Sequence, residues 1–148
     1  MIRYATLDDI EFLIALCREF YIETGSNEYY NFDPKSVELT LKNLILSKYV
    51  ITDGKHGMFA FNIYPAFYDY KSNILNEVFW YVRKKKISRT KRGLIALKLL
   101  KRIDEEAKLN NVRHVCINNL MKYKYKKTEK LFYQIGYTHR ENKYMKEV

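Results

Sequence analysis

The chain alternates between two spacings of apolar residues, and this alternation restricts its fold more than any other sequence feature. The segment 6–23 repeats apolar residues every three or four positions, which is the spacing of one helix face. These residues are Ile10, Leu13, Ile14, Cys17 and Tyr21. Thr6 and Asp9 stand three residues apart at its start, as in a capping box. A second helix is predicted from Pro34, because proline suits the first helical turn. Its inner face carries Val37, Leu41, Leu44 and Ile45.

Runs rich in β-branched and aromatic residues lie between the helical segments and predict strands. The run "YVITDGKHGMFAFNIYPAF" surrounds Asp53-Gly54, a dipeptide typical of hairpin turns. "NILNEVFWYVR" predicts the next strand, and "VRHVCIN" predicts a strand suited to the middle of a sheet. The sequence also predicts a short strand at 2–5, helices at 94–111 and 126–136, and a closing hairpin at 137–148. The order of elements is then β-α-α-β-β-β-α-β-α-β-β. In the helix at 94–111, Ala96, Leu100, Ile103 and Ala107 share one face. Gly136 is expected to cap the helix at 126–136. This order favours a mixed α/β sheet in one domain over residues 1–148.

The amino-acid composition limits the partners and the location that can be expected for the protein. The chain has 27 Lys and Arg against 17 Asp and Glu, a formal charge of +10, which favours encounters with polyanions and anionic small molecules. No apolar run approaches the roughly 20 residues that cross a bilayer, and the start shows no signal-peptide pattern. We therefore expect a cytoplasmic protein that makes no use of a membrane.

Cysteine and histidine do not predict a metal site. Cys17 and Cys116 have no metal-ligand spacing, and we expect two reduced, buried thiols. His56, His114 and His139 are scattered over three segments and are interpreted as structural or exposed.

The segment "VRKKKISRTKRGLIA" carries seven basic residues in the ten positions from Arg83 to Arg92, between a predicted strand and a predicted helix. The first helical N–H groups lack intrahelical partners, and the helix dipole favours an anion there. Arg89, Lys91 and Arg92 would add charge, and Gly93 would let a phosphate approach the main chain. Two alternatives stay open: a solvated charge run and a nucleic-acid patch.

The order of the elements and the basic segment together resemble those of the GNAT superfamily of acyl-CoA-dependent N-acetyltransferases. The resemblance covers nearly the whole chain. "IRYATLDDI" is similar to the opening strand and capped helix of that family. "LFYQIGYTHRENKYMKEV" resembles its "L-Y-E-K-L-G-F" helix end and closing hairpin. The resemblance implies a mostly antiparallel sheet flanked by helices, in a compact member like those encoded by bacteriophages.

The resemblance also implies acetyl-CoA as the cofactor, with CoA as its product. In the family, a loop of Gln or Arg, two residues, Gly, one residue and Gly or Ala holds the CoA pyrophosphate. "KRGLIA" resembles this loop from Lys91 to Ala96, with Leu94 in place of the middle glycine. The residues implied are Tyr81, Val82 and Arg83 through main-chain groups, and Arg89, Lys91, Arg92, Gly93, Leu94, Ile95, Ala96 and Asn118. Asn118 could instead begin a turn.

Acetyl transfer requires that the acceptor amine lose a proton and that the leaving thiolate gain one. In some relatives a glutamate at the place of Glu77 is the base, and alternation would set it on the face of Phe79 and Tyr81. The alternative for Glu77 is a strand-end carboxylate exposed or paired with a lysine. The tyrosine that often protonates the thiolate falls at Phe132, which has no proton to donate. Tyr133 is the candidate beside it, with Tyr123 and Tyr125 as alternatives.

The acceptor wall in this family comes from the first two helices and their loop, here "ETGSNEYYNFD". This loop would form an aromatic wall that also carries a carboxylate, which suits a cationic amine on a small molecule or a peptide. The residues implied are Glu28, Tyr29, Tyr30 and Phe32. The net charge points instead to a polyanionic partner such as an aminoacyl-tRNA. A homodimer stays open. The alternative function is a non-catalytic GNAT-like fold whose basic face binds nucleic acid or a protein.

Overall fold

The computed structural model describes residues 1–85, 87–118 and 125–139. The chain divides into two compact units, Met1–Asn118 and Asn119–Val148. The larger unit contains one five-stranded sheet, in the order β1-β2-β3-β4-β5. Its strands are β1 (Arg3–Tyr4), β2 (Val50–Thr52), β3 (Gly57–Ala66), β4 (Asp69–Val82) and β5 (Val112–Cys116). Its helices are α1 (Ile10–Glu23), α2 (Pro34–Leu46) and α3 (Arg89–Leu109), with two 3-10 turns, η1 (Leu7–Asp9) and η2 (Ser26–Glu28).

The helix starts follow from local hydrogen bonds that the sequence encodes. The Asp9 carboxylate accepts a hydrogen bond from the Thr6 N–H at 2.8 Å, which confirms the capping box. Asp33 caps α2 by accepting from the N–H groups of Lys35 and Ser36, and Pro34 takes the first helical position as predicted. Ser88 caps α3 by accepting from the Lys91 N–H at 3.2 Å.

The sheet is mixed and mostly antiparallel, as expected. The pairs β1–β2, β2–β3 and β3–β4 are antiparallel, and β4–β5 is parallel. The hairpin between β2 and β3 turns at Asp53-Gly54, as predicted, with Gly54 at a φ of 75°. The strand predicted at "VRHVCIN" is β5; among the described residues it pairs with β4 alone, and its residues are half-buried or exposed. Its predicted place in the middle of the sheet stays a prediction. The predicted closing hairpin falls largely on residues 140–148, outside the described part.

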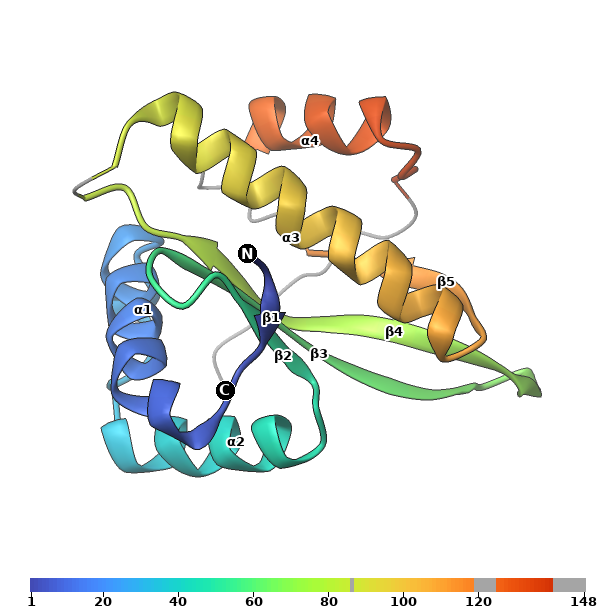
Figure 1. Cartoon of the computed structure of the whole chain (residues 1–148), viewed down its shortest axis with the longest axis horizontal. Helices are drawn as coiled ribbons and strands as arrows, with labels where there is room; N and C mark the ends of the chain where they lie inside the picture. The colour runs from blue at the N-terminus through green and yellow to red at the C-terminus, as the bar shows by residue number, and fades with distance from the viewer. Residues whose placement is uncertain (86, 119–124, 140–148) are drawn as a thin grey trace. The chain divides into compact units, whose positions relative to one another are not determined.

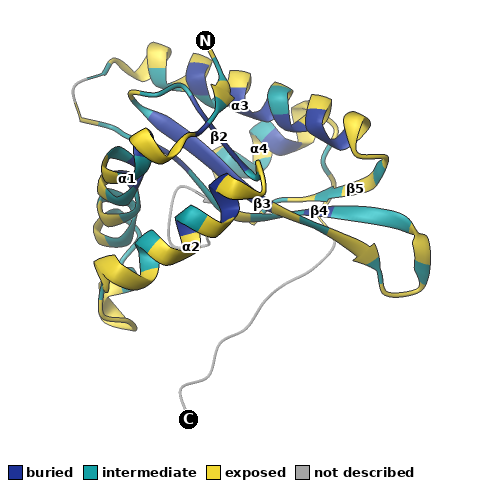
Figure 2. Ribbon diagram, turned by 60° about the horizontal axis from the view of Figure 1, so that its bottom comes forward, coloured by how far each residue is buried: buried dark blue, intermediate teal, exposed yellow. Residues whose placement is uncertain are grey.

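Helices cover both faces of the sheet (Figures 1 and 2). On one face, α1 and α2 bury Leu13, Leu16, Leu41, Leu44 and Ile45 against Val50, Met58, Ala60 and Tyr81. On the other face lies α3, whose buried residues include Ile95, Leu99, Leu100 and Ile103. The predicted helix faces are largely confirmed, although periodicity missed Leu16 and Leu99, which are fully buried.

A buried polar cluster joins the first strand to α3. Glu106 is 2% exposed, and its carboxylate accepts hydrogen bonds from the Tyr4 hydroxyl at 2.7 Å and from Arg102 at 2.6 Å. Burial raises the pKa of the Tyr4 phenol, and the bond to Glu106 raises it further. The buried carboxylate is thus compensated on both sides, as a charge in a protein interior must be.

The two cysteines have different environments. Both are free thiols. Burial raises the pKa of Cys17 to about 12, so this thiol stays protonated at neutral pH. Cys116 is exposed at the end of β5, and the prediction that it is buried is wrong, because β5 does not lie in the interior.

The smaller unit is described for residues 125–139. It holds α4 (Tyr125–Gln134), and Gly136 follows it at a φ of 92°, which confirms the predicted glycine cap. The Tyr137 N–H donates to the Phe132 carbonyl at 2.9 Å, and the two rings lie 5.6 Å apart. The end of α4 is therefore closed within the motif "LFYQIGY", by one main-chain hydrogen bond and one contact between two rings.

Candidate functional site

A β-bulge interrupts β4 at Val78. The β3–β4 register pairs Phe61 with Glu77 and Ala60 with Phe79, so Val78 is the extra residue. The pairing of β4 with β5 ends just before it, at Asn76 and Cys116. Beyond this point, β4 continues to Val82 and, within the described part of the chain, pairs with β3 alone. The second half of β4 therefore has a main-chain edge that β5 does not cover.

Glu77 lies where the two parallel strands separate. Its carboxylate accepts a hydrogen bond from the main-chain N–H of Asn118 at 2.6 Å. The predicted placement of Glu77 with Phe79 and Tyr81 is wrong, because the bulge breaks the alternation: Glu77 and Phe79 pair with adjacent residues of β3, which point to opposite faces. Phe79 and Tyr81 pack against Phe20 of α1, with ring centroids 4.8 Å and 5.7 Å away. The structure thus brings Glu77 together with Asn118, which sequence reasoning treated separately.

The edge of β4 that β5 does not cover carries main-chain groups. The Arg83 N–H donates to the His56 carbonyl at 2.8 Å. In an antiparallel pair, residues whose main-chain groups point to the partner alternate with residues whose groups point away. Tyr81 and Arg83 therefore direct these groups to β3, whereas Trp80 and Val82 direct theirs to the opposite edge. Of the three residues predicted to bind through the main chain, only Val82 has this orientation, because the register of β4 depends on the bulge, which the sequence does not reveal.

The basic segment after β4 is partly neutralised by α1. Arg83 donates to the Glu19 carboxylate at 2.7 Å, and its guanidinium lies 5.5 Å from the centre of the Phe12 ring. Lys84 forms an ion pair with Glu23. The first two cations of the segment are thus held by the second half of α1. They tie the β4–α3 connection to the helix that leads into the predicted acceptor loop.

This tie should contribute measurably to stability. Replacing Arg83 by methionine keeps apolar contact with Phe12 but leaves Glu19 without its cation, so we expect the free energy of unfolding to fall by about 1–2 kcal/mol. Lys42→Met is the matched control, because it breaks the exposed Lys42–Glu38 pair, a contact of a kind that contributes about 0.3–0.5 kcal/mol. Urea unfolding at neutral pH measures both. Equal losses in the two variants would show that the Arg83 pair is an ordinary surface contact.

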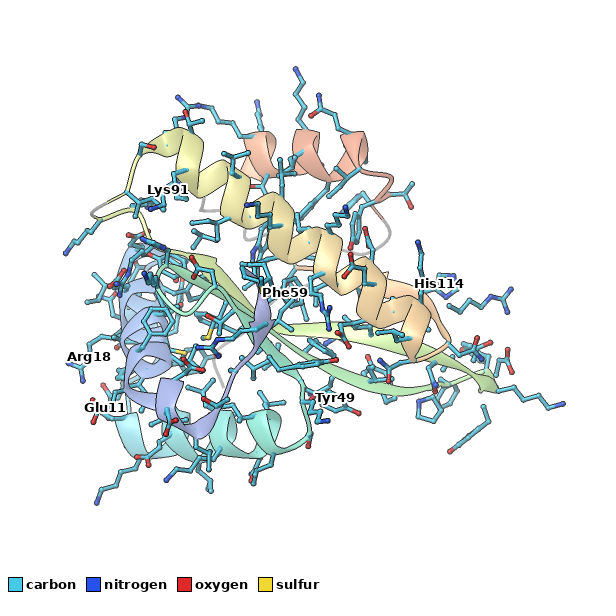
Figure 3. The ribbon with its side chains drawn as sticks, in the orientation of Figure 1. Glu11, Arg18, Tyr49, Phe59, Lys91 and His114 are labelled. Carbon is cyan, nitrogen blue, oxygen red and sulfur yellow. The ribbon has the colours of Figure 1, made fainter. Side chains whose placement is uncertain are left out.

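The start of α3 differs from its predicted position. The helix begins at Arg89 rather than near Leu94, so Arg89, Lys91 and Arg92 occupy its first turn and Gly93 lies within the helix. The error has a clear cause: Ser88 is the capping residue, and the basic residues that follow it were interpreted as loop. Lys91 lies at this end of α3 in Figure 3. In the described part of the chain, none of these three cations forms an ion pair.

Gly93 leaves an open space on the exposed side of α3, just after this first turn. A Cβ built on it would meet nothing within 4 Å. Leu94 is exposed, Ile95 is buried and Ala96 is half-buried. Of these three predicted residues, Ile95 is therefore the one whose side chain packs in the core. Three cations at a helix start and a missing side chain beside them fit the phosphates of a cofactor.

The loop between α1 and α2 carries the predicted acceptor residues. Tyr29 and Tyr30 are exposed, and Glu28 ends the turn η2 with its carboxylate 3.2 Å from where a Cβ of Gly25 would lie. Phe32 instead packs on Tyr21, at 5.4 Å between ring centroids, with the Arg18 guanidinium 4.9 Å from its ring centre. The two tyrosines are therefore exposed on the loop, whereas Phe32 anchors it.

The predicted proton donor lies in the smaller unit. Tyr133 is exposed on α4, and its hydroxyl lies 3.5 Å from the Glu129 carboxylate. Phe132 is buried. Tyr123 lies outside the described residues. The role of Tyr133 stays a prediction.

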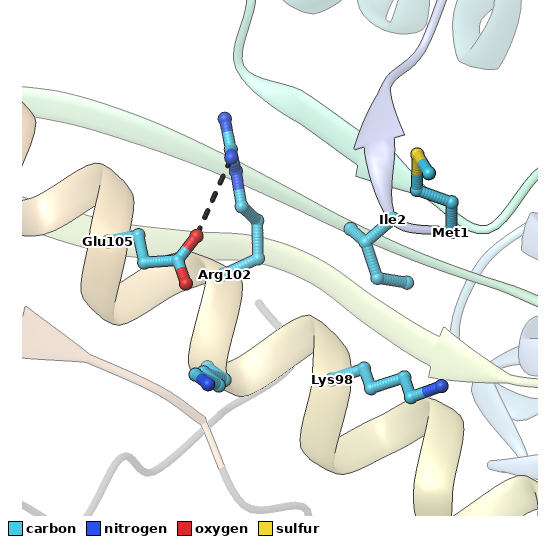
Figure 4. A pocket seen from close by; sticks show the side chains of 6 residues that line it. Met1, Ile2, Lys98, Arg102 and Glu105 are labelled. Atoms are coloured by element: carbon cyan, nitrogen blue, oxygen red, sulfur yellow. Dashed lines mark hydrogen bonds and ion pairs between the residues drawn. The ribbon is translucent and has the colours of Figure 1, made fainter.

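A shallow pocket of about 310 Å³ lies elsewhere, beside the middle of α3 (Figure 4). It is lined by Met1, Ile2, Lys98, Lys101, Arg102 and Glu105, and none of these is a predicted site residue. Within residues 1–85, 87–118 and 125–139, no three His, Cys, Asp or Glu side chains gather as metal ligands. None of the helices described there is long and apolar enough to cross a membrane.

Comparison with solved structures relates this geometry to known proteins. A structure from Arthrobacter sp. FB24, assigned as an acetyltransferase, superposes with a TM-score of 0.76 at 15% identity, over 100% of this chain and 96% of the other. An acetyltransferase structure with acetyl-CoA from Clostridium acetobutylicum gives 0.71 at 16% identity, over 99% and 95%. The chain has the GNAT fold. An aminoglycoside acetyltransferase in complex with sisomicin, from an uncultured soil metagenomic sample, shares the GNAT fold too, with a TM-score of 0.70 at 12% identity over 100% and 95%. No protein-family model matches the sequence, and no curated protein matches it.

Proposed function

We propose that the protein is an acetyl-CoA-dependent N-acetyltransferase that moves an acetyl group directly to a primary amine. The observation that carries this proposal is the separation of β4 from β5 at the Val78 bulge, which leaves a main-chain edge leading to the first turn of α3. An extended cofactor arm can bind along such an edge by hydrogen bonds, as an added strand does. The presence of acetyl-CoA in one GNAT-fold neighbour supports the choice of donor.

The residues have separate tasks in this proposal. Acetyl-CoA supplies an activated acetyl thioester. Val82 would bind its arm through main-chain groups, and Arg89, Lys91 and Arg92 would surround its phosphates at the start of α3. Gly93 would leave room for them. Glu77, held by Asn118 at the strand separation, would accept the proton of the amine.

The acceptor is proposed to be a cationic amine. Tyr29 and Tyr30 are exposed aromatic surfaces on the loop after α1, and Glu28 adds a carboxylate beside them. An aromatic face and a carboxylate both attract an ammonium group. The sisomicin complex among the GNAT-fold neighbours shows an aminoglycoside in such a fold, which supports this class of acceptor.

Thermal unfolding with ligands tests the cofactor proposal. A ligand at about 100 times its Kd stabilises the folded state by about 2.7 kcal/mol, so acetyl-CoA and CoA should raise Tm by about 5 °C or more. S-acetylpantetheine, which lacks the phosphates, should have a much smaller effect. A duplex DNA at low and moderate salt is the comparison for a basic face that binds nucleic acid. Stabilisation by the duplex but not by acetyl-CoA would overturn the enzyme proposal.

A further inference from the structure

The tip of the β3–β4 hairpin exposes four aromatic side chains within seven residues. Tyr64 is 45% exposed, Phe67 85%, Tyr68 96% and Tyr70 85%. The paired strands reach beyond the ends of α2 and α3, so neither helix covers the tip (Figures 1 and 2). Exposed aromatic surface of this kind marks an interaction site more often than a structural need. The cofactor site proposed above makes no use of it.

The rings at the tip are held by the strands rather than by a core. The register pairs Tyr64 with Ile74 and Ala66 with Asp69, so the turn that carries Phe67 and Tyr68 is closed at its base. The Phe67 and Tyr68 rings contact each other edge to face, with centroids 4.9 Å apart. Their outer faces are therefore presented to solvent on a fixed scaffold.

The charged side chains at the tip are Asp69, Lys71 and Arg113. Asp69 is the acidic residue of the turn, and its carboxylate accepts from the Ser72 hydroxyl at 2.6 Å and from the Lys71 N–H at 3.1 Å. The Arg113 guanidinium lies 3.6 Å from the same carboxylate and compensates its charge. Lys71 is exposed beside the rings and has no ion pair among the described residues. The whole chain adds a formal charge of +10.

We propose that this hairpin tip binds single-stranded nucleic acid by stacking bases on Phe67, Tyr68 and Tyr70, with Lys71 close to the phosphates. Unpaired bases offer flat faces to aromatic side chains, and a positively charged surface retains the backbone. A duplex keeps its bases stacked inside and offers the rings no such face.

The test measures fluorescence anisotropy of a labelled 20-nucleotide oligothymidylate titrated with the full chain at 50 mM salt. The triple variant Phe67→Ala/Tyr68→Ala/Tyr70→Ala should weaken binding at least tenfold, because each stacked base contributes substantially. Tyr68→Phe/Tyr70→Phe keeps the rings and should keep the affinity. Leu39→Ala/Leu46→Ala removes two exposed apolar residues of α2 and should change nothing. Acetyl-CoA stabilisation should be equal in all variants, which separates this proposal from the cofactor proposal.

Several outcomes would overturn it. Equal affinity of the triple variant and the unaltered chain would assign binding to the basic surface alone. Absence of binding to the oligonucleotide would remove the site. Sedimentation with phosphatidylcholine–phosphatidylserine vesicles that depends on the three rings, without such dependence for the oligonucleotide, would assign the tip to a lipid surface.

Discussion

Replacing Gly93 by aspartate is expected to abolish acetyl-CoA binding while the protein remains folded. The new side chain would enter space that the protein leaves empty, since a Cβ at this position meets nothing within 4 Å. It would place a carboxylate on the exposed side of the α3 start, where Arg89, Lys91 and Arg92 otherwise attract an anion. Like charges brought together cost several kcal/mol, so the Kd should rise about 100-fold or more. Isothermal titration with acetyl-CoA measures the change.

Gly93→Ala separates the effect of charge from that of bulk. Alanine in a helix interior is more stable than glycine by about 0.5–1 kcal/mol, so this variant should unfold at a slightly higher temperature. Its acetyl-CoA affinity should fall less than that of the aspartate variant. If Gly93→Asp binds acetyl-CoA as tightly as the unaltered protein, the start of α3 does not hold the phosphates.

Glu77→Gln should lower kcat by about 100-fold or more and leave acetyl-CoA binding unchanged. The amide of glutamine can still accept the Asn118 N–H, so the link at the strand separation is kept. The amide cannot take a proton from the acceptor amine, and loss of a general base commonly costs 10²–10⁴-fold in rate. Release of CoA thiol with a panel of polyamines and aminoglycosides measures turnover.

Glu77→Ala provides the comparison, because it removes both the base and the link to Asn118. We expect it to be less stable than Glu77→Gln and equally inactive. A pH profile of Glu77→Gln should lose the ascending limb that the base produces. Full activity of Glu77→Gln would assign Glu77 a structural role only, as the bond to Asn118 also permits.

Local sequence patterns predicted the helices, strands and turns well, but they predicted less well how the strands pair and pack. The helices at Thr6 and Pro34, the Asp53-Gly54 hairpin and the Gly136 cap follow from neighbouring residues, and the structure confirms them. The GNAT fold also followed from the order of elements and is confirmed. The pairing of β5 with β4 and the exposure of Cys116 depend on how distant strands pack, which residue composition does not specify.

In the candidate site too, residue types and spacings could be predicted from the sequence, whereas contacts between distant residues could not. Basic residues near Gly93 were identified from type and spacing, but their place in the first turn of α3 depended on the Ser88 cap. The pairing of Arg83 with Glu19 joins residues 64 positions apart, and no spacing rule connects them. The position of Glu77 at the end of the β4–β5 pairing depends on the bulge at Val78, which no residue type predicts.

The bulge at Val78 limits how this strand can change over time. Loss of Val78 would place Glu77 directly before Phe79, opposite Phe61 and Ala60, so the later side chains of β4 would keep their faces and the strand would become regular. The local bend that a bulge produces would be lost at the point where the pairing of β4 with β5 ends. Substitutions at Val78 keep the extra residue and its bend, whereas its deletion does not. Lineages of this protein should therefore vary in the identity of residue 78 and preserve its presence.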